Sequence, residues 1–94
     1  MSNKRFENQV AVVTGAGRGI GEAIAKRLAA EGAKIAVVSR TEANSAKVAD
    51  AINALAPDTA KPYAVDVADF DAVQKAGDQI LADFGRCDIL VNNA

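Results

Sequence analysis

The chain has 94 residues, of which 50% are hydrophobic, 24% charged and 4% aromatic, a composition typical of one small globular domain. Eleven basic and twelve acidic residues give a formal net charge of -1 without a concentrated run of either sign, so neither nucleic acid nor an anionic membrane is an expected partner. The single cysteine, Cys87, excludes an internal disulfide and is expected to be a packing position, and the absence of histidine argues against a metal site.

The apolar segments are short. The longest aliphatic runs, 10–13 and 35–38, fall far below the roughly 18 residues that indicate a membrane span. The first seven residues are polar and lack the apolar stretch of a signal peptide. We therefore expect a cytoplasmic protein without a membrane partner.

The first half of the chain alternates between strand and helix patterns. An apolar, largely β-branched run predicts a strand over 9–14 that is buried on both faces. Apolar residues at every fourth position then predict a helix over 20–32, closed by a glycine. A second strand is expected over 34–39, and a weaker helical stripe over 41–55 ends before Pro57.

The second half continues the same alternation. After a loop that includes Pro62, a third strand is expected over 63–65. Asp69 is a plausible cap for the next helix, which ends at Gly85, and 87–92 predicts a fourth strand. One face of that helix is expected to carry Val73, Ile80, Leu81 and Phe84. This order predicts an α/β protein with a partial Rossmann fold, in which a four-stranded parallel sheet of order 3-2-1-4 has helices on both faces.

A glycine-rich bend, 14–21, joins the first strand to the first helix. Glycines leave backbone amides uncovered at a helix start, where the helix dipole also attracts an anion such as a phosphate. The common dinucleotide fingerprint fails here, because Ile20 stands where its third glycine belongs. The spacing is instead Gly15, three residues, Gly19, one residue, Gly21. A tight turn without a ligand remains an alternative interpretation.

This bend, with its preceding threonine, resembles the cofactor motif of the short-chain dehydrogenase/reductases. Asp66 and Val67 follow the third strand as the adenine-contacting pair of that family does, and 92–94 resembles the start of its Asn-Asn-Ala-Gly motif. The sequence around these motifs is most similar to that of the 3-oxoacyl-acyl-carrier-protein reductases of fatty acid biosynthesis. The resemblance therefore implies a dinucleotide cofactor and the fold predicted above.

The resemblance also assigns residues to the cofactor. Its pyrophosphate and adjoining ribose would be surrounded by Gly15, Gly17, Arg18, Gly19, Ile20 and Gly21. Asp66 and Val67 would meet the adenine and Asn92 the ribose, whereas Asn93 would brace the sheet. Without the resemblance, Asp66 could equally be a helix cap or a solvated loop acid, and the two asparagines could form a strand-end turn.

The residues after the second strand bear on the choice of nicotinamide. An acid there would accept hydrogen bonds from a free ribose 2′-hydroxyl, but the strand ends in Ser39 and Arg40. Arg40, with Arg18 beside it, could donate charge-assisted bonds to a 2′-phosphate, each contributing about 1.5 to 3 kcal/mol. That contribution corresponds to roughly a 10-fold to 100-fold preference. The sequence predicts NADP(H), with Arg40 as a solvated loop charge the alternative; the missing acid also disfavours a flavin or S-adenosylmethionine site.

No catalytic residue is expected in this chain. The resembled reductases use a serine, a tyrosine and a lysine four residues after the tyrosine. Tyr63 is the only tyrosine and Val67 stands four residues beyond it, while the serines at 2, 39 and 45 all precede the fourth strand. We expect residues 1–94 to be the N-terminal, cofactor-binding half of a 3-oxoacyl-thioester type carbonyl reductase, inactive alone.

Two further expectations concern assembly. The chain could instead be a non-catalytic structural or assembly module that keeps the nucleotide fold. In either case the fourth strand lies at a sheet edge, and uncovered edges tend to pair. We therefore expect a homo-oligomer formed through the exposed edge of the fourth strand, or through the uncovered helix surface.

Overall fold

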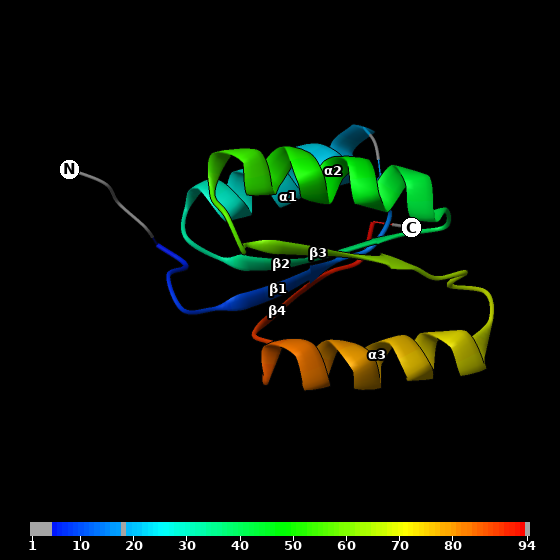
Figure 1. Cartoon of the computed structure of the whole chain (residues 1–94). Coiled ribbons are helices and arrows are strands. Elements are labelled where there is room, and N and C mark those ends of the chain that lie inside the picture. Colours follow the sequence, from blue (N-terminus) through cyan, green and yellow to red (C-terminus); the bar gives the residue numbers. More distant parts are fainter. Residues whose placement is uncertain (1–4, 18, 94) are drawn as a thin grey trace.

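The computed structural model describes residues 5–17 and 19–93. In this part of the chain strands and helices alternate as β1 (Val10–Val13), α1 (Gly19–Ala30), β2 (Lys34–Ser39), α2 (Glu42–Leu55), β3 (Ala60–Ala64), α3 (Phe70–Phe84) and β4 (Ile89–Val91). All paired strands are parallel and their order is β3-β2-β1-β4. Helices α1 and α2 cover one face of the sheet and α3 covers the other (Figure 1). The predicted partial Rossmann fold is confirmed.

The core consists of two apolar layers, one on each face of the sheet. On the α1 and α2 face, Val13 and Ile35 pack with residues of the two helices such as Val48. On the α3 face, Val38 packs with Ile80 of α3. Successive residues of a strand point to opposite faces, so a central strand that is buried on both faces must be apolar throughout. This requirement accounts for the continuous apolar run of β2.

Three predicted helix boundaries are confirmed. Helix α3 is capped by Asp69, whose side chain accepts a hydrogen bond from the Ala72 N–H at 3.1 Å. It ends at Gly85, which has a φ of 81° in the left-handed region that terminates many helices. Helix α1 is followed by Gly32, which has a φ of 99°. Each of these boundaries is set by a local residue preference.

The third strand begins earlier than predicted. β3 starts at Ala60 instead of Tyr63, and Pro62 lies inside it and not in a loop. The N–H of Val65 donates to the Ser39 carbonyl at 2.8 Å, so the backbone N–H and carbonyl groups of the odd-numbered residues in this segment point towards β2. The backbone groups of Pro62 point the other way, towards the outer edge of the sheet. A proline, which lacks an N–H, removes no ladder hydrogen bond at that position. Interpreting Pro62 as a loop residue was wrong because the proline lies in an edge strand.

The fourth strand is shorter than predicted. β4 covers Ile89–Val91, and the backbone N–H of Val10 donates to the Asp88 carboxylate at 2.8 Å just before it. Arg86 donates to the same carboxylate at 2.7 Å, and both hydrogen bonds lower the pKa of Asp88, the Arg86 bond more strongly. Cys87 is exposed, so its expected role as a packing position is wrong. In the described ranges, no helix has the length and apolar character needed to cross a membrane.

Candidate cofactor site

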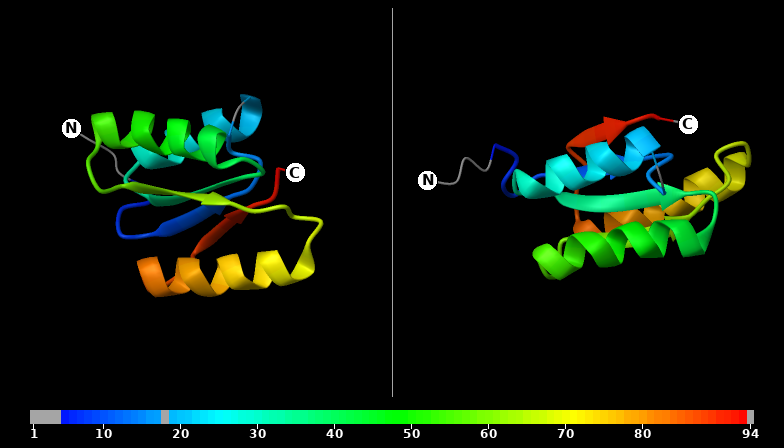
Figure 2. Two further views of the ribbon diagram at one scale, coloured as in Figure 1. Left: turned by 45° about the vertical axis from the view of Figure 1, so that its right-hand side comes forward. Right: turned by 90° about the horizontal axis from the view of Figure 1, so that it is seen from above.

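The glycine bend begins at the carboxyl end of β1 and is held there by β4. Thr14 donates its N–H to the Val91 carbonyl at 3.0 Å, and its Oγ1 accepts a hydrogen bond from the Asn93 N–H at 3.0 Å. The carboxyl ends of the parallel strands lie at one edge of the sheet (Figure 2). This is the edge at which ligands bind in open α/β sheets.

Close packing explains two of the glycines in the bend. Gly15 has a φ of 63°, and a Cβ there would overlap the backbone of Asn93, with its carbonyl carbon at 3.1 Å. A Cβ on Gly21 would lie 2.7 Å from the Gly15 carbonyl carbon and 2.9 Å from Asn93 Nδ2. The bend, the start of α1 and the end of β4 are therefore in backbone contact. Asn93 is the brace between them, as the resemblance implied.

Gly17 makes a similar close approach to the second βα unit. A Cβ at this position would lie 2.8 Å from the Cβ of Asn44 in α2 and 2.9 Å from the Cβ of Ser39. Ser39 is only 6% exposed, and its hydroxyl donates to the Thr41 carbonyl at 2.6 Å. The Ser39 side chain thus packs directly against Gly17 of the bend, and its hydroxyl is already hydrogen-bonded within the protein. Arg18 lies outside the described residues.

The first turn of α1 is open to solvent beside this bend. Gly19 is exposed, and Ile20 is 72% exposed. Glu22, the acid of this turn, accepts a hydrogen bond from Lys26 at 2.6 Å, which lowers the pKa of Glu22. The ion pair offsets a negative charge near the amino end of the helix, where an anion would approach.

A cavity of about 390 Å³ lies between the ends of β1, β2 and β3. It brings together five residues predicted from the sequence: Gly15, Ser39, Arg40, Asp66 and Val67. Its other lining residues are Val38, Val65 and Ala68. The cavity thus combines an apolar floor with charged groups, a combination common in small-molecule sites. The two floor valines directly precede the predicted Ser39 and Asp66, and that position was the signal that could have identified them.

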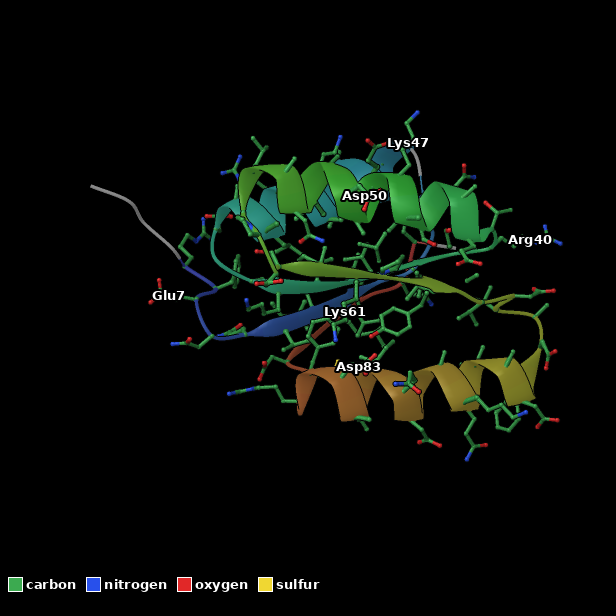
Figure 3. All side chains as sticks on the ribbon, viewed as in Figure 1. Glu7, Arg40, Lys47, Asp50, Lys61 and Asp83 are labelled. Carbon is green, nitrogen blue, oxygen red and sulfur yellow. The ribbon has the colours of Figure 1, made fainter. Side chains whose placement is uncertain are left out.

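The two charged residues of the cavity are both exposed. Arg40 extends from the end of β2 towards solvent (Figure 3). Asp66 Oδ1 accepts a hydrogen bond from the Ala68 N–H at 3.0 Å, which folds the loop after β3 into a turn. The cap of α3 is Asp69, so the alternative role of Asp66 as that cap is wrong.

The remaining predicted residues lie along the bend outside the lining of this cavity. Asn92 is exposed and accepts a hydrogen bond from the Thr14 hydroxyl at 3.2 Å. It therefore lies beside the start of the glycine bend. Gly17, Gly19, Ile20 and Gly21 form the rest of the bend and the start of α1. The structure thus places the predicted residues that it describes along one edge of the sheet, in two groups.

The fold and the glycine bend define a nucleotide-binding type of α/β domain. The family model for short chain dehydrogenases matches residues 9–94. The chain belongs to the short-chain dehydrogenase/reductase family.

Individual relatives agree with this assignment. The chain is 42% identical over 89 residues to the 3-oxoacyl-[acyl-carrier-protein] reductase of Escherichia coli, covering 95% of the chain and 35% of the relative. A metagenomic short-chain oxidoreductase in complex with NADP superposes with a TM-score of 0.89 at 43% identity, covering 95% of this chain and 40% of that one. The 3-ketoacyl-(acyl-carrier-protein) reductase of Brucella melitensis complexed with NADH superposes with a TM-score of 0.84 at 41% identity, covering 90% of this chain and 33% of that one. The chain spans 28 to 35% of the length of such curated relatives.

Proposed function

We propose that this chain is the NADP(H)-binding portion of a carbonyl reductase that acts on 3-oxoacyl thioesters. The observation that most directly supports this proposal is the cavity at the ends of the first three strands, which is lined by both Arg40 and Asp66. The relatives from Escherichia coli and Brucella melitensis, named as reductases of this type, support the substrate class. We propose a cytoplasmic location as well, on the sequence alone.

The proposed contacts follow the layout of the bend and the cavity. The uncovered amides of the bend bind the pyrophosphate, Asp66 and Val67 contact the adenine, and Asn92 contacts the adjoining ribose. The residues proposed to surround the pyrophosphate and its ribose are Gly15, Gly17, Arg18, Gly19, Ile20 and Gly21. Ser39 acts here through its position beneath Gly17, because its hydroxyl donates to Thr41.

Arg40 selects the phosphorylated cofactor in this proposal. Its guanidinium borders a cavity that also contains Asp66, and a 2′-phosphate would accept charge-assisted hydrogen bonds from it. Such bonds contribute about 1.5 to 3 kcal/mol, which corresponds to roughly a 10-fold to 100-fold tighter binding of NADPH than of NADH. Solved neighbours with NADP and with NADH both exist, so direct titration of this chain decides the preference.

The test titrates NADPH and NADH into the wild type, Arg40→Ala and the control Lys75→Ala, with nucleotide fluorescence as the readout. Lys75 is an exposed cation on α3 that is not among the lining residues of the cavity. We expect NADPH preference in the wild type and the control, and its loss in Arg40→Ala. Equal affinities for the two cofactors in the wild type would contradict the assignment.

We further propose that the chain binds cofactor without turnover. Carbonyl reduction needs a proton donor beside the substrate as well as hydride from the cofactor. The only tyrosine, Tyr63, donates its hydroxyl hydrogen bond to Asp83 at 2.6 Å, and burial together with that carboxylate raises the pKa of Tyr63. Such a hydroxyl is a poor acid. NADPH should therefore not be consumed when a 3-oxoacyl thioester is added, and steady consumption would show that a donor has been missed.

A non-catalytic structural module is the second candidate, and one observation favours it. The close packing around Gly15, Gly17 and Gly21 already requires glycine without any ligand. The two candidates differ in nucleotide binding. Saturable binding of NADPH supports the cofactor portion, whereas a well-folded sample that fails to bind at millimolar nucleotide supports the structural module.

A further inference from the structure

Asn44, in the first turn of α2, lies directly beside the glycine bend. A Cβ added to Gly17 would lie 2.8 Å from the Cβ of Asn44, so the Asn44 side chain starts at the bend itself. The backbone N–H of Ala16 donates to the Val38 carbonyl at 2.9 Å, which holds the bend against β2 at the same place. The position of Asn44 relative to the bend is therefore fixed by close packing.

The side chain of Asn44 is exposed although its backbone is packed. Helix α2 is capped by Thr41, whose Oγ1 accepts a hydrogen bond from the Asn44 N–H at 3.4 Å, so the Asn44 side chain is not needed to begin the helix. An asparagine amide carries two N–H donors. Hydrogen bonds from such donors to an ionised phosphate oxygen are charge-assisted and stronger than those between neutral groups.

Two other residues of α2 show that Asn44 lies on the side of this helix that faces α1. Ala51, seven residues or nearly two helical turns later, lines a groove together with Lys26 of α1. Lys47, one turn after Asn44, acts on the first turn of α1. The pKa of Glu22 in that turn is lowered mainly by Lys26, and Lys47 adds a smaller attraction. Asn44 and Lys47 are therefore the polar residues that the start of α2 presents towards α1.

The acid of the same turn points the other way. Residues two apart on a helix face nearly opposite sides, and Glu42 lines a different groove, together with Pro62 and Tyr63 of the outer strand β3. The first two turns of α2 therefore separate their charges, with an amide and a lysine on the side of the bend and a carboxylate on the opposite side. Such an arrangement favours an anion at the bend.

We propose that Asn44 is a second specificity residue of the cofactor site, whose side-chain amide donates a hydrogen bond to the ribose 2′-phosphate that Arg40 binds. This inference rests on the proposed function. Arg40 directly follows Ser39, and a Cβ on Gly17 would contact the Cβ atoms of Ser39 and Asn44 at 2.9 and 2.8 Å. A phosphate beside Gly17 is therefore bordered by the end of β2 on one side and by Asn44 on the other. Arg40 supplies the charge, and Asn44 supplies a donor whose position is fixed by the helix.

The test titrates NADPH and NADH into the wild type, Asn44→Asp and the control Ala43→Asp. Asn44→Asp replaces the donor by a carboxylate of nearly the same size, and an acid in the first turn of a helix is compatible with folding. NADPH should bind at least about tenfold more weakly to this variant and NADH within about twofold of the wild type, because only NADPH carries the 2′-phosphate. Ala43→Asp adds the same charge in the same turn, at an exposed position about 100° around the helix, and should keep the wild-type ratio of the two affinities.

Nuclear magnetic resonance of the wild type gives a second readout without any substitution. The side-chain amide signals of Asn44 should shift on saturation with NADPH and much less with NADH, and equal shifts with the two cofactors would overturn the proposal.

The outcomes of the titration separate the possible roles of Asn44. If Asn44 only packs against Gly17, Asn44→Asp weakens both cofactors alike, and that result overturns the proposal. Equal losses of NADPH preference in Asn44→Asp and Ala43→Asp also overturn it, because the effect would then come from added charge alone. An unchanged preference in Asn44→Asp, beside its loss in Arg40→Ala, overturns this inference and leaves the proposed function intact. A wild type that saturates with neither nucleotide, or with both equally, overturns the proposed NADP(H) function and this inference with it.

Discussion

Alanine at Gly21 and alanine at Gly77 should have opposite effects on stability, although both glycines lie inside helices. Helix propensity alone predicts that each substitution stabilises the protein by up to about 1 kcal/mol. Surroundings decide the outcome. A Cβ at Gly77 meets no atom within 4 Å, whereas a Cβ at Gly21 would lie 2.7 Å from the backbone of Gly15.

The expected magnitudes follow from these contacts. Gly77→Ala should gain about 0.4 to 1 kcal/mol, which raises the melting temperature by roughly 2 to 8 °C in a domain of this size. At Gly21 the new methyl group meets backbone on one side and Asn93 on the other, so the cost belongs at the upper end, about 3 kcal/mol, of the range for overpacking. After the gain of about 1 kcal/mol in propensity, a loss of about 2 kcal/mol remains.

Thermal melts followed by circular dichroism measure both variants against the wild type. NADPH titration supplies a second comparison, because displacement of Gly15 should weaken nucleotide binding in Gly21→Ala and leave it unchanged in Gly77→Ala. The packing argument fails if Gly21→Ala melts at or above the wild-type temperature. It also fails if Gly77→Ala lowers that temperature.

Three further predictions concern polar side chains. Asn53→Ala should cost about 1 to 3 kcal/mol in urea unfolding, because it leaves backbone groups before and within β3 without their partner. Arg86 and the β1 backbone lower the pKa of Asp88, so its stabilisation is complete above about pH 4 and lost as pH falls through the folded pKa; in Asp88→Asn the acid limb of the stability profile should flatten. Burial and Asp83 raise the pKa of Tyr63, so its stabilisation is complete below about pH 10 and lost as pH rises through the folded pKa; phenolate absorbance should appear only above the pH of free tyrosine, and appearance at the ordinary pH would contradict this contact.

The order of elements could be predicted because its signals are local. The cap Asp69 and the terminating glycines Gly32 and Gly85 act within one helical turn, and their effects need no tertiary context. The predictions for Pro62 and Cys87 were wrong because the structural setting of each residue depends on segments distant in the sequence. Whether a proline interrupts a strand depends on whether that strand lies at an edge, and only the assembled sheet determines this.

The cavity residues could be predicted for a different reason. In a parallel sheet, loops that follow different strands converge at the carboxyl edge, so strand ends alone indicate that Ser39, Arg40 and Asp66 lie close together. The strand pattern cannot show what each polar group binds. The Ser39 hydroxyl donates to a carbonyl two residues away, and this contact depends on the backbone path between β2 and α2.

The roles of the two asparagines depend on the register of β1 against β4. Val13 pairs with Val91, and this places the Asn93 N–H on Thr14 and the Asn93 side chain against Gly21, while Asn92 remains exposed. Side chains alternate between faces, so a slip of one residue could bring Asn92 to the position that Asn93 occupies. The same contact would then be made from a strand whose Ile89 and Val91 had left the core. The packing of β4 therefore selects which asparagine braces the glycine bend, a choice that two adjacent asparagines do not indicate without the family resemblance.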